Sequence, residues 1–284
     1  MLNLLSDYNI SFLEKVEVDI LKITDKCTKA CVHCSQSPEV GLSYISVKKF
    51  NDNIDNLVRI KEETGNDLLA NYILTSTDSD PFLHPDLAEL TKNLYQKTSK
   101  KFYLLTSGWY DHDKFQKNAD WILNNPEYIE KAALTLSNFP TNPSSIFNNA
   151  KLFINAVKTF GDLPEDKFII SPQYTEGVND YHIHSKKQVK DLLNYVIDKA
   201  GFNKKHFEGR IHYRPIIGLG RASSKLDVKE VEQYRIEAEN PLPVISTREE
   251  ERPYSGLINI KGELLIIEAQ RAILNRNLKD YYRL

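Results

Sequence analysis

The chain has 284 residues, of which 41% are hydrophobic and 27% charged, and its formal net charge is −2. This composition is typical of an ordinary soluble globular chain that is long enough for one large domain with a full core. No basic stripe suits a nucleic-acid backbone, and no apolar run approaches the roughly 20 residues that a membrane-spanning helix needs. We therefore expect a cytoplasmic protein with no nucleic-acid partner and no membrane partner.

Strand and helix signals alternate along most of the chain. Strands are predicted at residues 16–23, 72–75, 102–106, 132–136, 168–170 and 210–214. Amphipathic helices are predicted between them. Two of these helices carry clear end signals, with Ser46 and Ser185 as N-terminal caps and Gly65 and Gly201 as stops.

Six β-α units with short connections imply parallel strands joined by right-handed crossovers. We therefore predict an α/β fold, a partial (β/α)6 TIM-type barrel over residues 16–222, preceded by an N-terminal extension at 1–15. A doubly wound, Rossmann-like sheet is the alternative that periodicity alone leaves open. Residues 223–284 are expected to form a C-terminal extension that caps the barrel or contacts substrate, with a β-hairpin over 255–268 and a helix-like tail.

All three cysteines, Cys27, Cys31 and Cys34, lie within eight positions directly after the first predicted strand. Three thiolates spaced C-x3-C-x2-C on one loop can each bind one iron of a 4Fe-4S cluster and leave the fourth iron open to a small molecule. A zinc site is the main alternative, although structural zinc usually takes four ligands from two separated pairs, and only histidines such as His33 could complete the set. A disulfide framework is not expected, because the cysteine count is odd and the N-terminus does not resemble a secretory signal.

With this loop the chain resembles the radical S-adenosylmethionine (SAM) enzymes, whose signature is C-x3-C-x2-C with an aromatic residue before the last cysteine. His33 takes that place here. The resemblance implies that the three cysteines hold a single 4Fe-4S cluster and that SAM binds its open iron. One electron then splits SAM into methionine and a 5'-deoxyadenosyl radical, which abstracts hydrogen from substrate. An electron donor such as flavodoxin or ferredoxin is the implied redox partner.

Further candidates follow the strand ends, because ligands of parallel β/α folds gather at the carboxyl edge of the sheet. The segment from Thr75 to Asp86 resembles the family's G-G-E-P segment, which binds the amino group of SAM, so Asp78 and Asp80 are candidate cofactor residues. A polar turn before a helix is the alternative interpretation of this segment. The resemblance implies further cofactor contacts at Ser107, Ser137, Ile217 and Gly218, the last two beside the adenine. Ser171 is a further candidate because it follows the fifth predicted strand at the same edge.

The substrate class stays open between a peptide and a small polar metabolite. The Gly-Arg-Ala sequence at 220–222 and the hairpin resemble peptide-modifying members with a SPASM or twitch extension, but this extension has no cysteines for a second cluster. Peptide maturation, epimerisation, rearrangement and elimination are all compatible with this set of features. Candidate substrate contacts are Tyr110, Tyr174, His182 and Arg221. A zinc-stabilised binding protein without radical chemistry is the alternative function.

Overall fold

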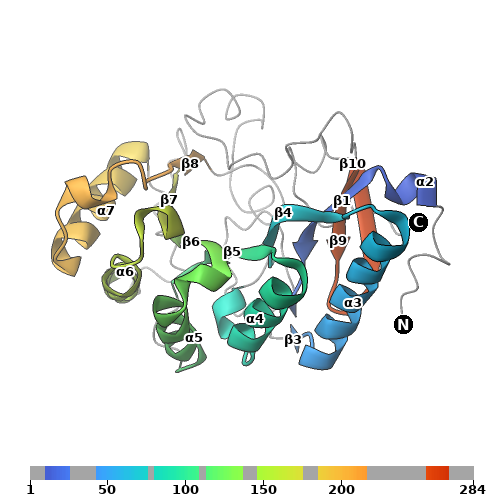
Figure 1. Cartoon of the computed structure of the whole chain (residues 1–284). Coiled ribbons are helices and arrows are strands. Elements are labelled where there is room, and N and C mark those ends of the chain that lie inside the picture. The colour runs from blue at the N-terminus through green and yellow to red at the C-terminus, as the bar shows by residue number, and fades with distance from the viewer. Residues whose placement is uncertain are drawn as a thin grey trace.

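The structure is a computed structural model, which describes residues 10–25, 43–75, 80–108, 113–136, 146–174, 185–215 and 254–268 (Figure 1). These ranges form a mixed α/β fold whose main sheet is mostly parallel, as the sequence predicted. The strands of this sheet are β1 (Val16–Leu21), β4 (Leu69–Leu74), β5 (Lys101–Thr106), β6 (Ile129–Leu136), β7 (Phe168–Tyr174), β8 (Arg214–Pro215), β9 (Tyr254–Ile258) and β10 (Leu264–Glu268). A separate pair consists of β2 (Thr24–Asp25) and β3 (Ser43–Tyr44).

The order of strands across the main sheet is β10-β9-β1-β4-β5-β6-β7-β8. From β1 to β8, strands that follow one another in the main sheet lie side by side and pair in parallel. A doubly wound sheet would reverse its strand order at a central switch point. The observed order has no such reversal between β1 and β8, and it therefore excludes the Rossmann-like alternative.

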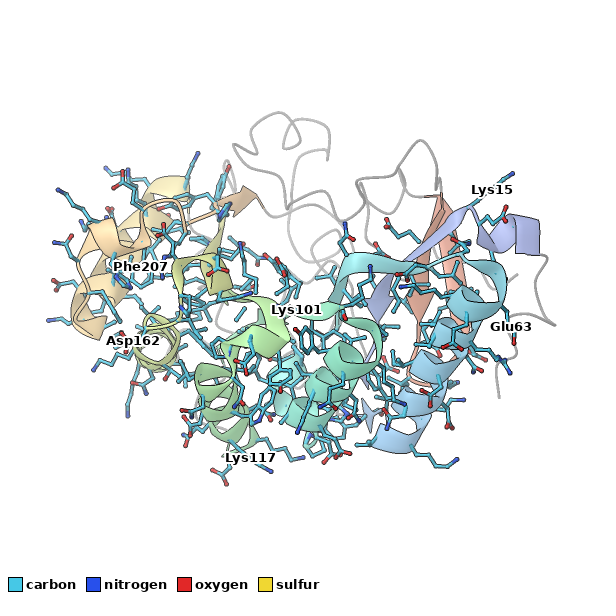
Figure 2. All side chains as sticks on the ribbon, in the orientation of Figure 1. Lys15, Glu63, Lys101, Lys117, Asp162 and Phe207 are labelled. Atoms are coloured by element: carbon cyan, nitrogen blue, oxygen red, sulfur yellow. The ribbon has the colours of Figure 1, made fainter. Side chains whose placement is uncertain are left out.

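The helices that connect these strands lie along one side of the sheet (Figure 1). They are α3 (Val47–Thr64), α4 (Leu87–Thr98), α5 (Asp113–Asn124), α6 (Ile146–Phe160) and α7 (Lys186–Ala200), preceded by a short α2 (Ile10–Leu13). Short 3-10 helices are η1 (Pro81–Leu83), η2 (Pro126–Tyr128), η4 (Glu165–Lys167) and η5 (Lys204–Phe207). The outer faces of the helices are polar, and Glu63 and Lys117 are exposed there and point away from the sheet (Figure 2).

The predicted helix ends are confirmed where the sequence carried a local signal. Ser46 accepts a hydrogen bond from the backbone N–H of Lys49 at the start of α3, and Gly65 ends that helix at a left-handed φ of 74°. Ser185 begins α7 with a reciprocal capping box, and Gly201 ends it at φ 88°. These caps satisfy backbone groups that the helix itself leaves without partners.

Side chains alternate between two apolar clusters on the two faces of the sheet, as the pleat of a strand requires. On β5, Phe102 and Leu104 belong to the large core, whereas Tyr103 and Leu105 belong to a second, smaller cluster. We call this smaller group the second apolar cluster; it contains Ile20, Leu74, Tyr103, Ala133, Ile169 and Leu257, with Leu105 and Leu265 packed against it. It therefore crosses the sheet from the hairpin to β7.

The two edges of the sheet differ from expectation in detail. The sixth predicted strand, at 210–214, is reduced to β8 and one bridge between Ile170 and Ile211, and β8 lies at one edge of the sheet. Pro215 lacks a backbone N–H, which suits an edge. At the other edge the predicted hairpin forms, with β9 and β10 antiparallel, and β9 pairs in parallel with β1 from Val16↔Tyr254 onward. The hairpin thus enlarges the main sheet.

Within the ranges given above, the structure has no helix that is both long enough and apolar enough to cross a membrane.

Candidate functional site

The carboxyl end of β1 leads into the segment that carries the cysteines, and both ends of that segment are fixed at one place. β2 precedes the segment, β3 follows it, and the two strands pair antiparallel. The backbone N–H of Ile45 donates to the carbonyl of Ile23 at 3.0 Å, and the N–H of Ile23 donates to the carbonyl of Thr75 at 3.1 Å. Segment 26–42 therefore leaves and rejoins the described structure at the carboxyl ends of β1 and β4. We call the β2–β3 pair together with Ile45 the neck.

An ion pair between a buried lysine and a partly exposed aspartate lies at the neck. The side chain of Lys22 is 8% exposed, and its Nζ donates to Asp25 Oδ1 at 2.7 Å. The backbone N–H of Lys22 donates to the carbonyl of Ile258 at 2.8 Å, which ties the end of β1 to the end of β9. Burying an ammonium is costly unless a carboxylate compensates it. Asp25 provides that compensation directly before the cysteine segment begins.

Asp80 links the carboxyl end of β4 to the carboxyl end of β5 through hydrogen bonds. Its side chain is 6% exposed. Oδ1 accepts the N–H of Phe82 at 3.1 Å and so caps η1, while Oδ2 accepts from the Thr106 hydroxyl, the Ser107 N–H and the Ser107 hydroxyl, each at 2.9 Å. The Thr106 hydroxyl oxygen in turn accepts the N–H of Gly108 at 3.1 Å. Two residues that the sequence singled out, Asp80 and Ser107, are thus bonded to each other.

His84 connects the same region to the neck. Its Nδ1 accepts the N–H of Asp86 at 3.0 Å, so the ring proton must sit on Nε2, which donates to the carbonyl of Ile45 at 3.0 Å. The ring is fully buried and meets Tyr44 edge to face. Burial lowers the pKa of His84 below its usual range, and the positive charge of Lys114 acts in the same direction, against the smaller opposing effects of the Ile45 carbonyl and Asp86. The histidine is therefore neutral at neutral pH.

Asn118 completes this network from α5. Its Nδ2 donates to the carbonyls of Phe82 at 2.7 Å and His84 at 2.8 Å. Both carbonyls lie shortly after β4 in the chain, so the buried amide of Asn118 fixes the backbone from Phe82 to His84. The neck, η1 and α5 consequently form one hydrogen-bonded unit at the carboxyl edge of the sheet.

Two polar atoms at this edge are buried and have no hydrogen-bond partner among the described residues. They are Oγ1 of Thr75, which follows β4, and Oε1 of Gln173, near the end of β7. A buried polar group without a partner costs about 1–3 kcal/mol. Such atoms are often satisfied by a ligand or an ordered water.

The other described candidates are more enclosed. Ser171 is buried, and its hydroxyl is 3.4 Å from the carbonyl oxygen of His212. Tyr174 is 2% exposed, and the ammonium of Lys186 lies 5.6 Å from the centre of its ring. The remaining candidates, Cys27, Cys31, Cys34, His33, Asp78, Tyr110, Ser137, His182, Ile217, Gly218 and Arg221, lie outside the described residues. Among the residues described, no three His, Cys, Asp or Glu side chains converge as metal ligands.

Four residues of this region were not singled out from the sequence: Lys22, His84, Thr106 and Asn118. His84 and Thr106 lie in the segments that were selected for Asp80 and Ser107. Asn118 carried a usable signal, because it occupies the buried face of α5 together with Phe115 and Ile122. A polar side chain on an apolar helix face usually has a specific partner. Lys22 directly follows β1, which also contains Glu17 and Asp19, so it carried no comparable signal.

No family model matches the chain, and no curated protein matches it. Among solved structures, the chain is similar to the radical S-adenosylmethionine methyltransferase TsrM from Kitasatospora setae, with tryptophan substrate and the SAM analog aza-SAM bound. The TM-score is 0.41 at 10% identity, over 74% of this chain and 38% of that chain. The chain thus spans well under half of that protein's length. A TM-score this low does not establish a shared fold, so no functional conclusion is taken from the likeness.

Proposed function

We propose that the chain is a radical SAM enzyme in which Cys27, Cys31 and Cys34 hold one 4Fe-4S cluster. The observation that carries the proposal is the C-x3-C-x2-C spacing on a segment whose two ends are fixed at the carboxyl ends of β1 and β4. Ligands of parallel β/α proteins bind at that edge of the sheet. The same three thiols elsewhere in the chain would make a weaker case.

The described residues fit a polar cofactor at this edge. The carbonyl of Thr75 accepts the N–H of Ile23 beside the neck. The Thr75 hydroxyl oxygen and the Gln173 amide oxygen near the end of β7 are buried and have no partner in the part of the chain that the structure describes. The bonds of Asp80 hold its carboxylate and the Ser107 hydroxyl together at the ends of β4 and β5. In this proposal Asp80 and Ser107 act on SAM as a pair, and Asp78 is a further proposed contact. Ser137, Ser171, Ile217 and Gly218 are further proposed contacts.

When bound, the cluster supplies one electron that divides SAM into methionine and a 5'-deoxyadenosyl radical, and that radical takes a hydrogen atom from a peptide or small-metabolite substrate. The chain's own residues position the reactants and exclude water. Tyr110, Tyr174, His182 and Arg221 are the proposed substrate contacts, and a flavodoxin or ferredoxin is the proposed reductant. Because the hairpin has no cysteine, a single cluster is proposed.

We further infer that the sheet from β1 to β8 curves as a partial (β/α)6 barrel. Its sequential strand order and the helices along one side support this form. In a barrel of this kind the carboxyl edge becomes a mouth over which a cofactor and a substrate can meet.

The test is the iron, sulfide and zinc content of protein purified and reconstituted without oxygen, followed by dithionite and SAM and a mass-spectrometric search for 5'-deoxyadenosine. We expect about four irons per chain and 5'-deoxyadenosine formation. Cys27→Ala should lose both, whereas Ser37→Ala, a change in the same segment that removes no thiol, should keep both. Stoichiometric zinc with no cluster would overturn the proposal in favour of the zinc-stabilised binding protein.

A further inference from the structure

A cavity of about 190 Å³ opens at the carboxyl end of the β1–β9 pair, next to the neck. Its apolar lining comes from the hairpin, namely Leu257 on β9, Ile260 in the turn and Leu265 on β10. Lys22 and Asp25 line it from β1 and the neck, and Lys261 lines it from the turn. Because β9 runs parallel to β1, this cavity opens on the same edge of the sheet as the cysteine segment.

The apolar part of the cavity continues the second apolar cluster. Leu257 belongs to that cluster and Leu265 packs against it. An apolar cavity of about 150 Å³ is large enough to bind benzene. A volume of 190 Å³ therefore accommodates one group of the size of an aliphatic side chain, and it is too small for a whole nucleotide or a large cofactor.

The charged part of the cavity favours an anion. Lys22 is paired with Asp25, so these two charges compensate each other. Lys261 is exposed, and its ammonium makes no hydrogen bond or ion pair within the part of the chain that the structure describes. Among the described lining residues, two ammonium groups and one carboxylate leave one positive charge. A carboxylate would meet a charge-assisted donor at Lys261.

The turn that carries Lys261 is held rigidly. Asn259 Oδ1 accepts the backbone N–H groups of Lys261 at 3.0 Å and Glu263 at 2.9 Å, and its Nδ2 donates to Glu263 Oε2 at 3.0 Å. The turn also lies against α3, since a Cβ added at Gly262 would come within 2.6 Å of Lys49 Cε. The backbone at Lys261 is therefore fixed before any ligand arrives, which lowers the entropic cost of binding.

We propose that this cavity binds a small carboxylate with a branched apolar chain of about five carbons. The chain lies against Leu257 and Leu265, and the carboxylate lies at the mouth, where it meets Lys261 beside the Lys22–Asp25 pair. Such a group can belong to a free carboxylic acid or to the C-terminal leucine-like residue of a peptide. The chemistry recognised at the cavity is the same for both sources.

The test follows the leucine methyl signals of the full-length protein, labelled with ¹³C, during titration with 4-methylpentanoate. We expect the methyl signals of Leu257 and Leu265 to shift saturably. The uncharged 4-methylpentanamide has the same shape and should bind about tenfold more weakly, because it lacks the charge-assisted contact. A short peptide that ends in leucine, with and without a C-terminal amide, separates the two sources. If only the free-acid peptide binds, the natural ligand is a peptide end. If only 4-methylpentanoate binds, the natural ligand is a free carboxylic acid.

Lys261→Gln should weaken binding of 4-methylpentanoate about tenfold. Lys92→Gln, which removes an exposed charge from α4, is the matched control and should leave binding unchanged. Leu265→Ala provides a second variant that weakens binding through the apolar wall. Absence of methyl shifts with both 4-methylpentanoate and the free-acid peptide up to about 10 mM, equal binding of the amide, or equal binding by Lys261→Gln and Lys92→Gln would overturn the proposal. The measurement reports binding and not turnover, so its outcome is independent of the proposed radical chemistry.

Discussion

Replacement of Asp80 should destabilise the protein in proportion to the buried donors that lose their acceptor. In Asp80→Ala, the Phe82 N–H and the Thr106 hydroxyl both lose a buried partner, whereas the N–H and the hydroxyl of the half-buried Ser107 can bond to water. At about 1–3 kcal/mol for each buried donor, the free energy of unfolding should fall by about 2–6 kcal/mol. The loss arises from hydrogen bonding and not from a cavity, because the side chain removed is small.

Asp80→Asn should be milder, because the amide oxygen can keep the position of Oδ2 and its three donors. The amide nitrogen then faces the Phe82 N–H, and only that one buried bond is lost. The expected cost is about 1–3 kcal/mol. Asp55→Asn is the matched control: Asp55 is an exposed residue of α3 paired with Lys97 of α4, and its loss should cost under about 1 kcal/mol.

Urea unfolding of the cluster-free protein, followed by circular dichroism at one fixed pH, measures all three variants. The predicted order of stability loss is Asp80→Ala, then Asp80→Asn, then Asp55→Asn. An Asp80→Asn variant as unstable as Asp80→Ala would refute the assignment of the three donors to Oδ2. An Asp80→Ala variant no less stable than the Asp55→Asn control would refute the structural role of the carboxylate altogether.

Two further predictions concern His84 and the hairpin turn. Since burial lowers the pKa of His84, the unfolded chain binds a proton first on acidification, and stability should fall as the pH drops below about 6.5, by at most about 1.4 kcal/mol per pH unit. His84→Gln should remove that part of the pH dependence in unfolding measured from pH 7.5 to pH 5; an unchanged profile would contradict it. Gly262→Ala combines a left-handed φ of 78° with crowding against Lys49 and Asn53, whereas Gly201→Ala has φ 88° and open space. Thermal unfolding should show about 1–2 kcal/mol lost for Gly201→Ala and more for Gly262→Ala; equal losses would show that the crowding is relieved freely.

Features with local causes could be predicted from the sequence. The ends of α3 and α7 were predictable because Ser46, Gly65, Ser185 and Gly201 act on backbone groups within one turn of themselves. The strands and their parallel arrangement followed from alternation with helices. The extent of β8 did not, because pairing with β7 decides it and residues 210–214 carry no boundary signal of their own.

The connections within the candidate site depend on contacts between distant parts of the chain. Asp80 was predicted to contact a cofactor, but its four bonds to Phe82, Thr106 and Ser107 could not be read from its own motif. The link from His84 to Ile45 crosses 39 positions and needs the neck to be closed first. Sequence spacing identified the residue types that chemistry requires, whereas the hydrogen-bond partners depend on which strand ends meet.

The place of the hairpin has a consequence for the order of folding. Val16 pairs with Tyr254. The backbone groups on one side of β1 therefore have no strand partner until a segment more than 200 residues later has been synthesised. Until β9 arrives, β1 exposes a row of unpaired backbone groups, which is a template for pairing with another chain. Contacts of such long sequence separation also slow folding. A nascent or truncated chain that ends before residue 254 should therefore need protection at this strand, because the main sheet is complete only once the hairpin has been synthesised.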